Sequence, residues 1–355
     1  MRFRSLYPMT AVIAGVLLAS HAYAAGKLVF VSLGGTYQAA QEAARAKPFA
    51  AQEKVELITD SSALSYAKIK VMVSAKDIQW DVVEVVASEY VNLVKDGLVE
   101  EIDYSKFDAQ TLKAIPEQFR PKHGVGAVMY AYGIGYRTDR NGAKHPTNLK
   151  EFWDLKNFPG ARVVPSGKSP VPPWEAALLA DGVPADKLYP IDFDRAIKSL
   201  DKVKGGVRLW FDDIASGAQA LISGDVDYGW LPNGRVLQAK AQGAKVDFDY
   251  GNSFLYTNYF VIPKGAKNKE NAMKFMAFAS TAKPSADLMK ALPYSTPNTD
   301  ALKLLDPAYA ETLPTSPKNL ARVIPMNGAF YGEQAGSGRT WQQVGLQKWN
   351  AWYGR

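Results

Sequence analysis

Apolar runs separated by helical segments make up the chain from residue 27 onward. The runs Lys27–Leu33, Val55–Thr59 and Trp80–Ala87 contain β-branched and aromatic residues at consecutive positions. Such runs are typical of strands that are buried on both faces of a parallel sheet. An alanine-rich stretch, Thr36–Ala51, predicts a helix between the first two strands. The alternation of strands and helices predicts an α/β fold.

The same patterning continues toward the C-terminus. Val125–Tyr136 predicts another strand, and Pro146–Asp154 and Trp174–Ala180 predict helices. Asn268–Ser280 predicts an amphipathic helix whose apolar face packs in the core. The chain has 355 residues, which is enough for two domains. Because no low-complexity linker divides it, we expect the two domains to be joined by several short crossings.

The first 24 residues predict a secretory signal peptide. Arg2 and Arg4 supply a positive start, Ala11–Ala19 is a short apolar stretch, and Ala22–Ala24 has the small-x-small pattern of a cleavage site. The apolar stretch is too short to cross a bilayer. An N-terminal anchor or a buried helix is the alternative. The sequence therefore predicts an exported protein whose signal peptide, residues 1–24, is removed.

Composition excludes several classes of function. The chain contains no cysteine and three histidines, which excludes disulfides, thiolate metal sites and a histidine-rich metal centre. The formal charge of +7 is mild, and the basic clusters are interleaved with acids, so nucleic acid is not an expected partner. Motifs of serine hydrolases, phosphate-binding loops, dinucleotide folds and zinc proteases are absent. The residues therefore give little support to an enzyme, and we expect no cofactor.

Aromatic and polar residues follow several of the predicted strands. Ligands of open α/β sheets bind where the carboxyl ends of strands meet. Aromatic faces attract a cation, and a carboxylate or amide can hold its ammonium group, so an amine ligand is expected. For any single aromatic residue, ordinary packing is the alternative. The candidates are Tyr37 after the Gly34-Gly35 turn; Ser88, Glu89 and Tyr90; Trp230, Asn233 and Arg235 around an apparent turn in Tyr228–Arg235; and Tyr256, Asn258 and Tyr259.

Four stretches of the sequence carry a family resemblance. They are Trp80–Asp103, Gly224–Arg235, Val261–Thr281 and Leu292–Asn298, in this order behind the predicted signal peptide. With them the chain resembles bacterial periplasmic solute-binding proteins of the spermidine/putrescine type, which deliver ligands to ABC transporters. The resemblance implies a periplasmic monomer with a type II binding-protein fold, in which two α/β lobes close on a small solute and a permease in the inner membrane recognises the closed form.

The resemblance also implies the extent of the lobes and part of the site. Lobe 1 would comprise residues 25–134 and 257–302, and lobe 2 would comprise residues 135–256 and 303–355. Of the family's polyamine site, the residues retained in this sequence are Tyr37, Ser88, Tyr90, Asn233, Gly234 and Tyr294. A further family acid falls near Trp174–Glu175.

The departures from the family pattern concern tryptophans and one acid. Gly34, Pro232 and Tyr256 stand where the family has tryptophans, and Asn258 stands where it has the aspartate that binds the ammonium group. Trp230 lies two residues before Pro232 and is a candidate replacement. The ligand-binding residues predicted in this way are Gly35, Tyr37, Ser88, Glu89, Tyr90, Trp174, Glu175, Trp230, Asn233, Arg235, Tyr256, Asn258 and Tyr294.

These departures bear on the identity of the amine. Loss of the carboxylate at Asn258 removes a charge-assisted hydrogen bond of about 1.5–3 kcal/mol. Arg235 could hold a carboxylate, although a solvated arginine is the alternative. A polyamine such as putrescine or spermidine and an ω-amino acid such as 4-aminobutyrate both remain candidates. Two other readings stay open, namely a ferric-iron binding protein of the same superfamily and a secreted lyase or hydrolase that uses no histidine.

Overall fold

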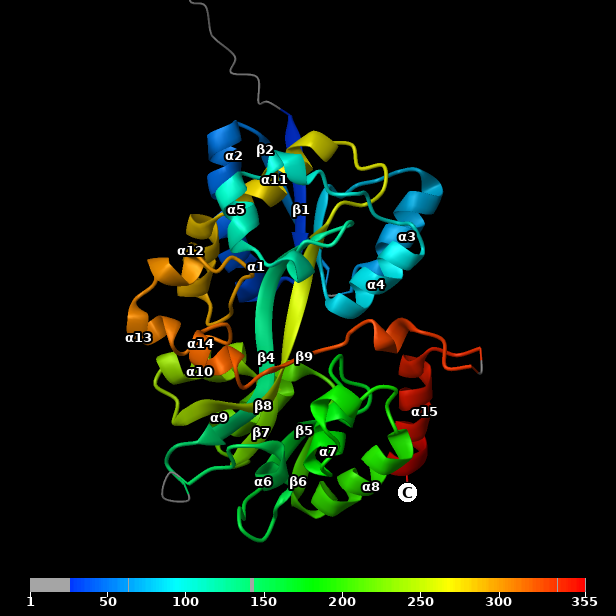
Figure 1. The fold of residues 1–355 in the computed structure, drawn as a ribbon, viewed down its shortest axis with the longest axis vertical. Helices are drawn as coiled ribbons and strands as arrows, with labels where there is room; N and C mark the ends of the chain where they lie inside the picture. Colours follow the sequence, from blue (N-terminus) through cyan, green and yellow to red (C-terminus); the bar gives the residue numbers. More distant parts are fainter. Residues whose placement is uncertain (1–25, 63, 141–143, 337, 355) are drawn as a thin grey trace, which may run out of the picture.

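A computed structural model describes residues 26–62, 64–140, 144–336 and 338–354 (Figure 1). The predicted signal peptide, residues 1–24, lies outside the described residues. The described strands form one sheet in the order β2-β1-β3-β8-β4-β7-β5-β6, with β9 paired to β8. The strands are β1 (Lys27–Ser32), β2 (Glu56–Ser61), β3 (Val82–Val85), β4 (Val125–Arg137), β5 (Arg162–Pro165), β6 (Val207–Phe211), β7 (Tyr228–Pro232), β8 (Val246–Val261) and β9 (Ile324–Pro325).

The sheet is parallel at its two ends and antiparallel in its middle. β1 pairs in parallel with β2 and β3, and β5 pairs in parallel with β6 and β7. β4 and β8 are antiparallel to each other, β8 is antiparallel to β3, and β4 is antiparallel to β7. A wholly parallel sheet, as the apolar runs suggested, is therefore wrong for the centre. The chain crosses from one half of the molecule to the other along β4 and returns along β8, so these two strands run in opposite directions.

The helices surround the two ends of this sheet. They are α1 (Gly35–Gln41), α2 (Lys47–Glu53), α3 (Tyr66–Ala75), α4 (Ala87–Lys95), α5 (Ala109–Ala114), α6 (Leu149–Trp153), α7 (Trp174–Ala180), α8 (Phe193–Val203), α9 (Ile214–Ser223), α10 (Asn233–Ala241), α11 (Lys269–Ala279), α12 (Ala282–Ala291), α13 (Pro307–Ala310), α14 (Pro317–Leu320) and α15 (Trp341–Tyr353). We call lobe 1 the body built on β1–β3 with α1–α5, α11 and α12, and lobe 2 the body built on β5–β7 with α6–α10 and α15. Figure 1 shows β4 and β8 running from one lobe into the other.

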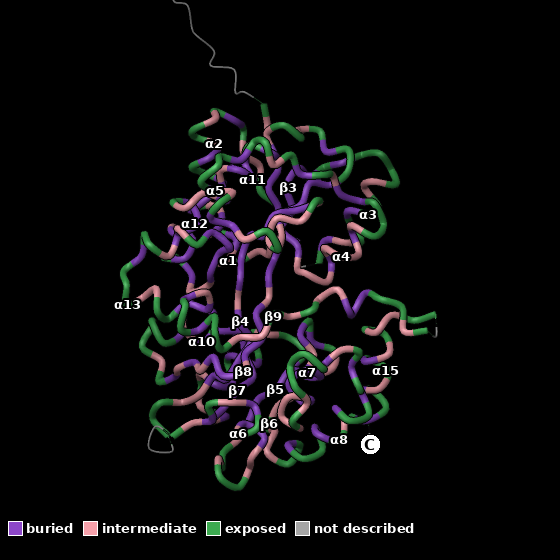
Figure 2. Tube along the Cα trace, in the orientation of Figure 1, coloured by how far each residue is buried: buried purple, intermediate pink, exposed green. Residues whose placement is uncertain are grey.

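Each lobe has its own buried core (Figure 2). In lobe 1 the strands alternate: Phe30 and Phe260 pack toward α11 on one face, while Val31 and Val83 pack toward α3 and α4 on the other. Lobe 2 has one large cluster that includes Trp230 and draws on α7, α8, α15 and the strands. Separate cores joined by β4 and β8 make the molecule two-lobed, and the space between the lobes is where a solute can bind.

Most predicted elements are confirmed, and one is wrong. The predicted strands Lys27–Leu33, Val55–Thr59 and Trp80–Ala87 correspond to β1, β2 and β3, and the predicted helix Trp174–Ala180 is α7. The helix Thr36–Ala51 is continuous, but five residues between α1 and α2 form a π-helical segment. The apparent turn in Tyr228–Arg235 does not exist: the first five residues are the buried strand β7, and Asn233 begins α10.

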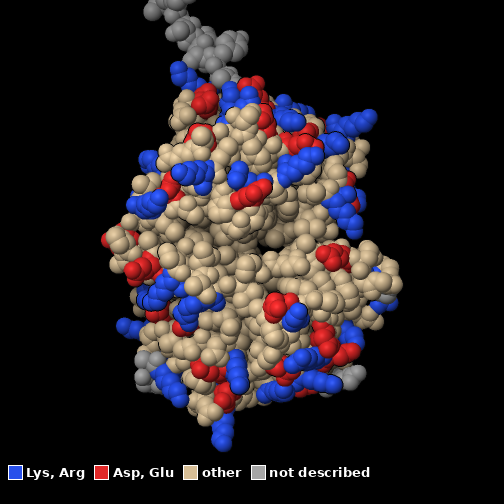
Figure 3. Space-filling model, viewed as in Figure 1, with Lys and Arg blue, Asp and Glu red and all other residues tan. Residues whose placement is uncertain are grey.

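The surface and the helices add two observations. On the face in Figure 3, side chains of both charge signs are scattered over both lobes, and the molecule is hollowed between them. Across the described ranges, the helices are all too short or too polar to traverse a lipid bilayer.

Candidate ligand-binding site

The candidate site lies where the carboxyl ends of strands from both lobes reach the two connecting strands. The carboxyl end of β3 pairs with β8 at Tyr259, and the carboxyl end of β7 pairs with β4 at Tyr132, which itself faces Phe254 of β8. The segment of β8 between Phe254 and Tyr259 is therefore flanked by both lobes. Such junctions are the usual ligand sites of open α/β sheets.

Five tyrosines form a cluster at this junction, and we call it the tyrosine cluster: Tyr37, Tyr130, Tyr132, Tyr256 and Tyr294. Ring centroids are 5.7 Å apart for Tyr37–Tyr294, 6.2 Å for Tyr130–Tyr294, 5.3 Å for Tyr130–Tyr256 and 5.8 Å for Tyr132–Tyr256. Strand register explains the grouping, because Tyr130 pairs with Tyr256 and successive odd or even positions share a face of the sheet. The cluster offers aromatic walls on which a small solute can pack.

A buried glutamate of lobe 1 borders this cluster. Glu84 of β3 is 0% exposed and accepts four hydrogen bonds. The donors are Ser32 Oγ at 2.8 Å, the Tyr37 hydroxyl at 2.5 Å, Gln41 Nε2 at 2.9 Å and Asn258 Nδ2 at 2.9 Å. Burial and the neighbouring Glu84 raise the pKa of Tyr37 well above its ordinary value, so this hydroxyl stays protonated and donates. Sequence reasoning missed Glu84, because it sits inside an apolar run that predicts only a buried strand.

Two buried polar atoms at the junction have no hydrogen-bond partner among the described residues. They are Asn258 Oδ1, in a side chain that is 2% exposed, and the hydroxyl of Tyr132, which is 0% exposed. Leaving such a group unpaired costs about 1–3 kcal/mol. Both residues lie on the same face of the β4–β8 ladder as Tyr130 and Tyr256. A solute with complementary polar groups would recover that free energy.

A positive charge faces the cluster from lobe 2. Arg235 stands in the first turn of α10 and is exposed, and within the described ranges no hydrogen bond or ion pair engages it. Burial raises the pKa of Tyr294, and the charge of Arg235 opposes that shift, as it does for Tyr132. Arg235 is therefore near both hydroxyls. The preceding Gly234 lets Tyr294 approach α10, because a Cβ there would lie 2.2 Å from the Tyr294 ring.

A second buried glutamate borders the cluster from lobe 2. Glu175, in the first turn of α7, is 2% exposed and accepts hydrogen bonds from the hydroxyl of Tyr331 at 2.7 Å to each oxygen and from that of Tyr189 at 3.0 Å. Burial raises the pKa of Glu175 to about 7, although both tyrosines oppose the shift. Its charge contributes, after burial, to the raised pKa of Tyr256, which shows that Glu175 and the tyrosine cluster are neighbours.

Three other predicted residues serve the packing of lobe 2. Trp174 packs against Phe193 and Trp349, and Trp230 packs edge-to-face against Phe254 with centroids 6.3 Å apart. Trp230 is 1% exposed and lies in the core of lobe 2. Asn233 accepts a hydrogen bond from the backbone N–H of Ala131 at 2.9 Å and donates to the carbonyl of Pro293 at 2.6 Å. It therefore ties α10 to β4 and to the segment that carries Tyr294.

The predicted residues of α4 lie beside the tyrosine cluster rather than within it. Glu89 is buried, and its carboxylate accepts a hydrogen bond from the backbone N–H of Tyr66 at the start of α3. Tyr90 stacks on Tyr259 at 4.5 Å, on the opposite face of β8 from Asn258, and burial raises its pKa to about 12. Ser88 lies in the first turn of α4. Gly328 packs against the preceding residue, because a Cβ on Gly328 would lie 2.9 Å from the Cβ of Ala87.

The glycine pair after β1 is explained by its backbone. Gly34 and Gly35 have φ angles of +82° and +59°, a region that favours glycine. This turn begins α1 and so brings Tyr37 back over the end of β1 toward Glu84. Gly35 itself is exposed.

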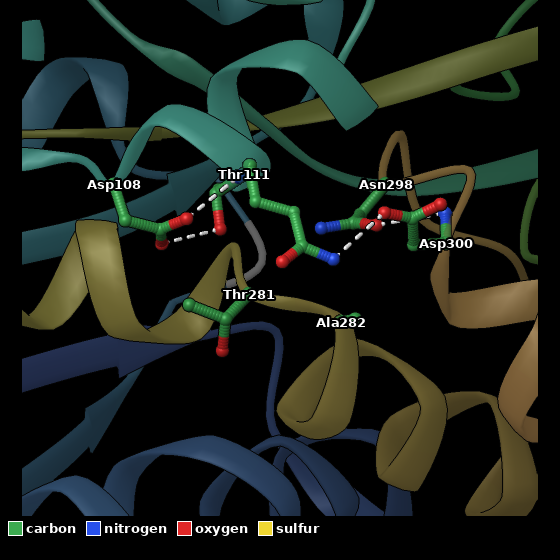
Figure 4. A pocket seen from close by; sticks show the side chains of 7 residues that line it. Asp108, Thr111, Thr281, Ala282, Asn298 and Asp300 are labelled. Atoms are coloured by element: carbon green, nitrogen blue, oxygen red, sulfur yellow. Dashed lines mark hydrogen bonds between the residues drawn. The ribbon is translucent and has the colours of Figure 1, made fainter.

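A pocket of about 200 Å³ lies elsewhere in lobe 1, between α5 and the start of α12 (Figure 4). Its carboxylates already have partners: Asp108 accepts hydrogen bonds from the backbone and side chain of Thr111, and Asp300 pairs with Lys303 at 2.6 Å. Because these groups are used within the protein, we do not assign solute binding to this pocket. In the part of the chain that the structure describes, no three His, Asp or Glu side chains come together as a metal-ligand set.

Comparisons with known proteins agree with this architecture. The chain matches the family model of bacterial extracellular solute-binding proteins over residues 44–315. It is 32% identical to a gamma-aminobutyric acid-binding protein of Pseudomonas aeruginosa, over 99% of this chain and 100% of that protein. It is 26% identical to a spermidine/putrescine-binding periplasmic protein of Escherichia coli, over 71% of this chain and 72% of that protein.

A solved structure gives the same result. An ABC transporter substrate-binding protein from Bradyrhizobium japonicum superposes with a TM-score of 0.83 at 34% identity, covering 92% of this chain and 99% of that one. Fold and site together thus define a two-lobed solute receptor. The chain belongs to the family of bacterial extracellular solute-binding proteins, as the substrate-binding component of an ABC transporter and not as an enzyme. The predicted family, fold and class of function are confirmed, and the family implies an extracytoplasmic location.

Proposed function

We propose that this protein captures a small ω-amino acid, with 4-aminobutyrate as the best candidate, between its lobes. The ammonium group would be accepted by Asn258 Oδ1 near the charge of Glu84, and the carboxylate would meet Arg235 and the hydroxyl of Tyr132. The observation that carries the proposal is that a buried acceptor and an exposed guanidinium, neither with a partner among the described residues, meet at one tyrosine cluster. Tyr130, Tyr256 and Tyr294 would enclose the aliphatic chain.

The same observations favour an amino acid over a polyamine. A polyamine carries an ammonium group at each end. Its second ammonium group would approach Arg235, which has the same charge and no carboxylate partner among the described residues. Charge-assisted hydrogen bonds to a carboxylate are worth about 1.5–3 kcal/mol, whereas like charges repel. The relative that is named for gamma-aminobutyric acid binding also matches this chain over a larger share of its length than the spermidine/putrescine-binding protein does.

We further propose the steps around binding. The chain would be exported by its N-terminal signal, act as a monomer in the periplasm, close its lobes on the solute and present the closed form to the permease. The lobes would be residues 25–134 with 257–302 and residues 135–256 with 303–355. Gly328 and Gly332, which face Ala87 and Asn92 of α4, leave room for the C-terminal segment of lobe 2 to approach lobe 1.

Calorimetric titration of the protein without its signal peptide tests the ligand. We expect 4-aminobutyrate to bind more tightly than putrescine. Arg235→Ala should weaken 4-aminobutyrate about ten- to a hundredfold, which corresponds to the loss of a charge-assisted hydrogen bond. Putrescine should be unaffected or bind better. Arg208→Ala is the matched control, because Arg208 is also exposed but lies on β6 near Gly160 and Gly205, at the far end of lobe 2.

Two results would overturn the proposal. One is tighter binding of putrescine than of 4-aminobutyrate by the unchanged protein. The other is an Arg235→Ala variant that binds 4-aminobutyrate as tightly as the Arg208→Ala control.

A further inference from the structure

We propose that Glu84 is a positioning residue: a buried relay from Arg45 through Gln41 and Glu84 turns the Asn258 amide so that its oxygen faces the solute. The relay would make this end of the site accept a hydrogen-bond donor and reject an acceptor, and so set the direction in which the solute lies. This inference rests on the proposed function, because it names the residues that give the ammonium end its polarity.

The relay begins with a group that can only donate. Arg45 is buried in the π-helical segment between α1 and α2, and its guanidinium donates to Gln41 Oε1 at 2.9 Å and to the carbonyl of Ala127 at 3.0 Å. Burial lowers the pKa of Arg45 to about 10, and the charge of Glu84 opposes that shift, so the side chain is protonated at neutral pH. An arginine has no acceptor atom. The Gln41 atom that faces it must therefore be the oxygen.

The orientation of Gln41 fixes the next contact. With its oxygen toward Arg45, Gln41 presents Nε2 to Glu84, and the two atoms are 2.9 Å apart. Each oxygen of Glu84 accepts two hydrogen bonds, from Ser32 and Gln41 on one and from Tyr37 and Asn258 on the other. A carboxylate in this state only accepts. The Asn258 atom beside it must be the amide nitrogen.

The consequence appears at the free end of the relay. Because Nδ2 of Asn258 is held by Glu84, Oδ1 is the amide atom left without a partner among the described residues. A side-chain amide presents either its NH₂ donor or its oxygen acceptor to a solute, depending on its orientation. Here the hydrogen bond from Nδ2 to Glu84 fixes the orientation of Asn258. The family that this chain resembles has an aspartate at the position of Asn258. In this chain the negative charge is instead on Glu84, the hydrogen-bond partner of Asn258.

Replacing Glu84 by glutamine tests the relay. The new amide can donate to Asn258 Oδ1, which allows the Asn258 amide to turn and show its nitrogen to the solute. The probes are 4-aminobutyrate and glutarate, which is matched in chain length but carries a carboxylate in place of the ammonium group. We expect Glu84→Gln to weaken 4-aminobutyrate at least tenfold in calorimetric titration and not to weaken glutarate. Asp81→Asn is the control, because Asp81 is also buried but directly precedes β3 and contacts Val29 and Asn268 rather than Asn258.

A second exchange separates positioning from simple support of the fold. The double variant Glu84→Gln/Asn258→Asp returns an acceptor to position 258 whichever way that side chain turns. We expect it to regain the preference for 4-aminobutyrate over glutarate. If Glu84→Gln does not fold, Arg45→Gln/Glu84→Gln removes both buried charges together, and the same loss of preference is expected. An unchanged ratio of the two dissociation constants in a folded Glu84 variant, checked by thermal unfolding, would overturn the relay.

The proposed function can fail without deciding the relay. If the unchanged protein bound neither 4-aminobutyrate nor putrescine, the proposed function would be wrong. The relay would then be tested by NMR through the side-chain NH₂ signal of Asn258, assigned by its loss in Asn258→Asp. Slow hydrogen exchange in the unchanged protein and fast exchange in Glu84→Gln would support the relay, and equal rates would contradict it.

Discussion

Glu84 in lobe 1 and Glu175 in lobe 2 are both buried glutamates that border the same tyrosine cluster, yet their surroundings differ. Glu84 accepts four hydrogen bonds and has the charge of Arg45 nearby. Glu175 is served by two tyrosine hydroxyls, and burial raises its pKa to about 7. The difference shows that burial alone does not determine which protonation state of a carboxyl group is favoured. The number of hydrogen-bond donors and the nearby charges contribute as well.

The origin of the donors differs as well. All donors to Glu84 come from lobe 1 or from the end of β8 that lies in lobe 1. The donors to Glu175 come from Tyr189, in the segment between α7 and α8, and from Tyr331, in the C-terminal segment that approaches α4. Glu84 is therefore held within lobe 1, whereas one of the two donors to Glu175, Tyr331, comes from a segment that lies beside both lobes.

The largest effect is expected when Glu84 is removed. Glu84→Leu leaves four donors unpaired and the buried charge of Arg45 without its neighbour, so the free energy of unfolding should fall by about 3–5 kcal/mol. Urea unfolding at pH 7 measures the loss. Adding Arg45→Met should recover part of it, because the uncompensated charge is then absent. A Glu84→Leu variant that unfolds at the same urea concentration as the unchanged protein would contradict this account of lobe 1.

A smaller, pH-dependent effect is expected at Glu175. Its ordinary pKa is 4.5 and its folded pKa is about 7, so between these values the unfolded chain has lost a proton that the folded protein keeps. Stability should therefore decrease as the pH rises through this window, by about 3 kcal/mol, and stay level above it. Glu175→Gln should remove this decrease.

Urea unfolding at intervals from pH 4 to 9 measures this effect, and the difference between the two proteins isolates Glu175 from all other titrating groups. If both proteins lose stability equally between pH 4.5 and 7, then Glu175 is not the group responsible, and its contrast with Glu84 disappears.

The smallest effect is expected at Tyr331. Tyr331→Phe removes the donor that faces both oxygens of Glu175. The loss should be about 1.5–2 kcal/mol at pH 8, where the carboxylate is charged, and about 1 kcal/mol at pH 5, where it is protonated. Tyr250→Phe is the control, because its hydroxyl donates to the carbonyl of Thr312, which does not titrate. A Tyr331→Phe loss that is independent of pH would show that the hydroxyl does not sense the charge of Glu175.

Part of the candidate site could be anticipated, Tyr37, Tyr256 and Asn258 from their places at strand ends and Tyr294 from the family resemblance. Tyr37, Tyr256, Asn258 and Tyr294 are brought together at the junction, and Arg235 faces them. Trp230 could not be assigned, because an apolar residue near a strand end packs into the core or the cleft according to strand register. In YGWLP the register of β7 turns Trp230 toward Phe254.

Glu84 is the opposite case to Trp230, because it borders the candidate site but was not predicted. Its neighbours in sequence are apolar, so the pattern predicts a buried strand and gives no sign that Glu84 has a role in a site. Its four partners come from β1, α1 and β8, and Asn258 is far from Glu84 along the chain. No local sequence pattern indicates that these residues contact one another. A polar residue inside an apolar run is the only signal that could have drawn attention to it.

By itself the sequence determined the α/β class and most strands and helices, because these depend on local periodicity and composition. The export signal and the amine-directed residues stay predictions. Tertiary structure decided that the centre of the sheet is antiparallel, that Trp230 belongs to a core, and that two buried glutamates flank one tyrosine cluster. It also decided which atom of the Asn258 amide is free. These features depend on contacts between residues far apart in the chain, and hydrogen-bond direction and burial exist only once those contacts form.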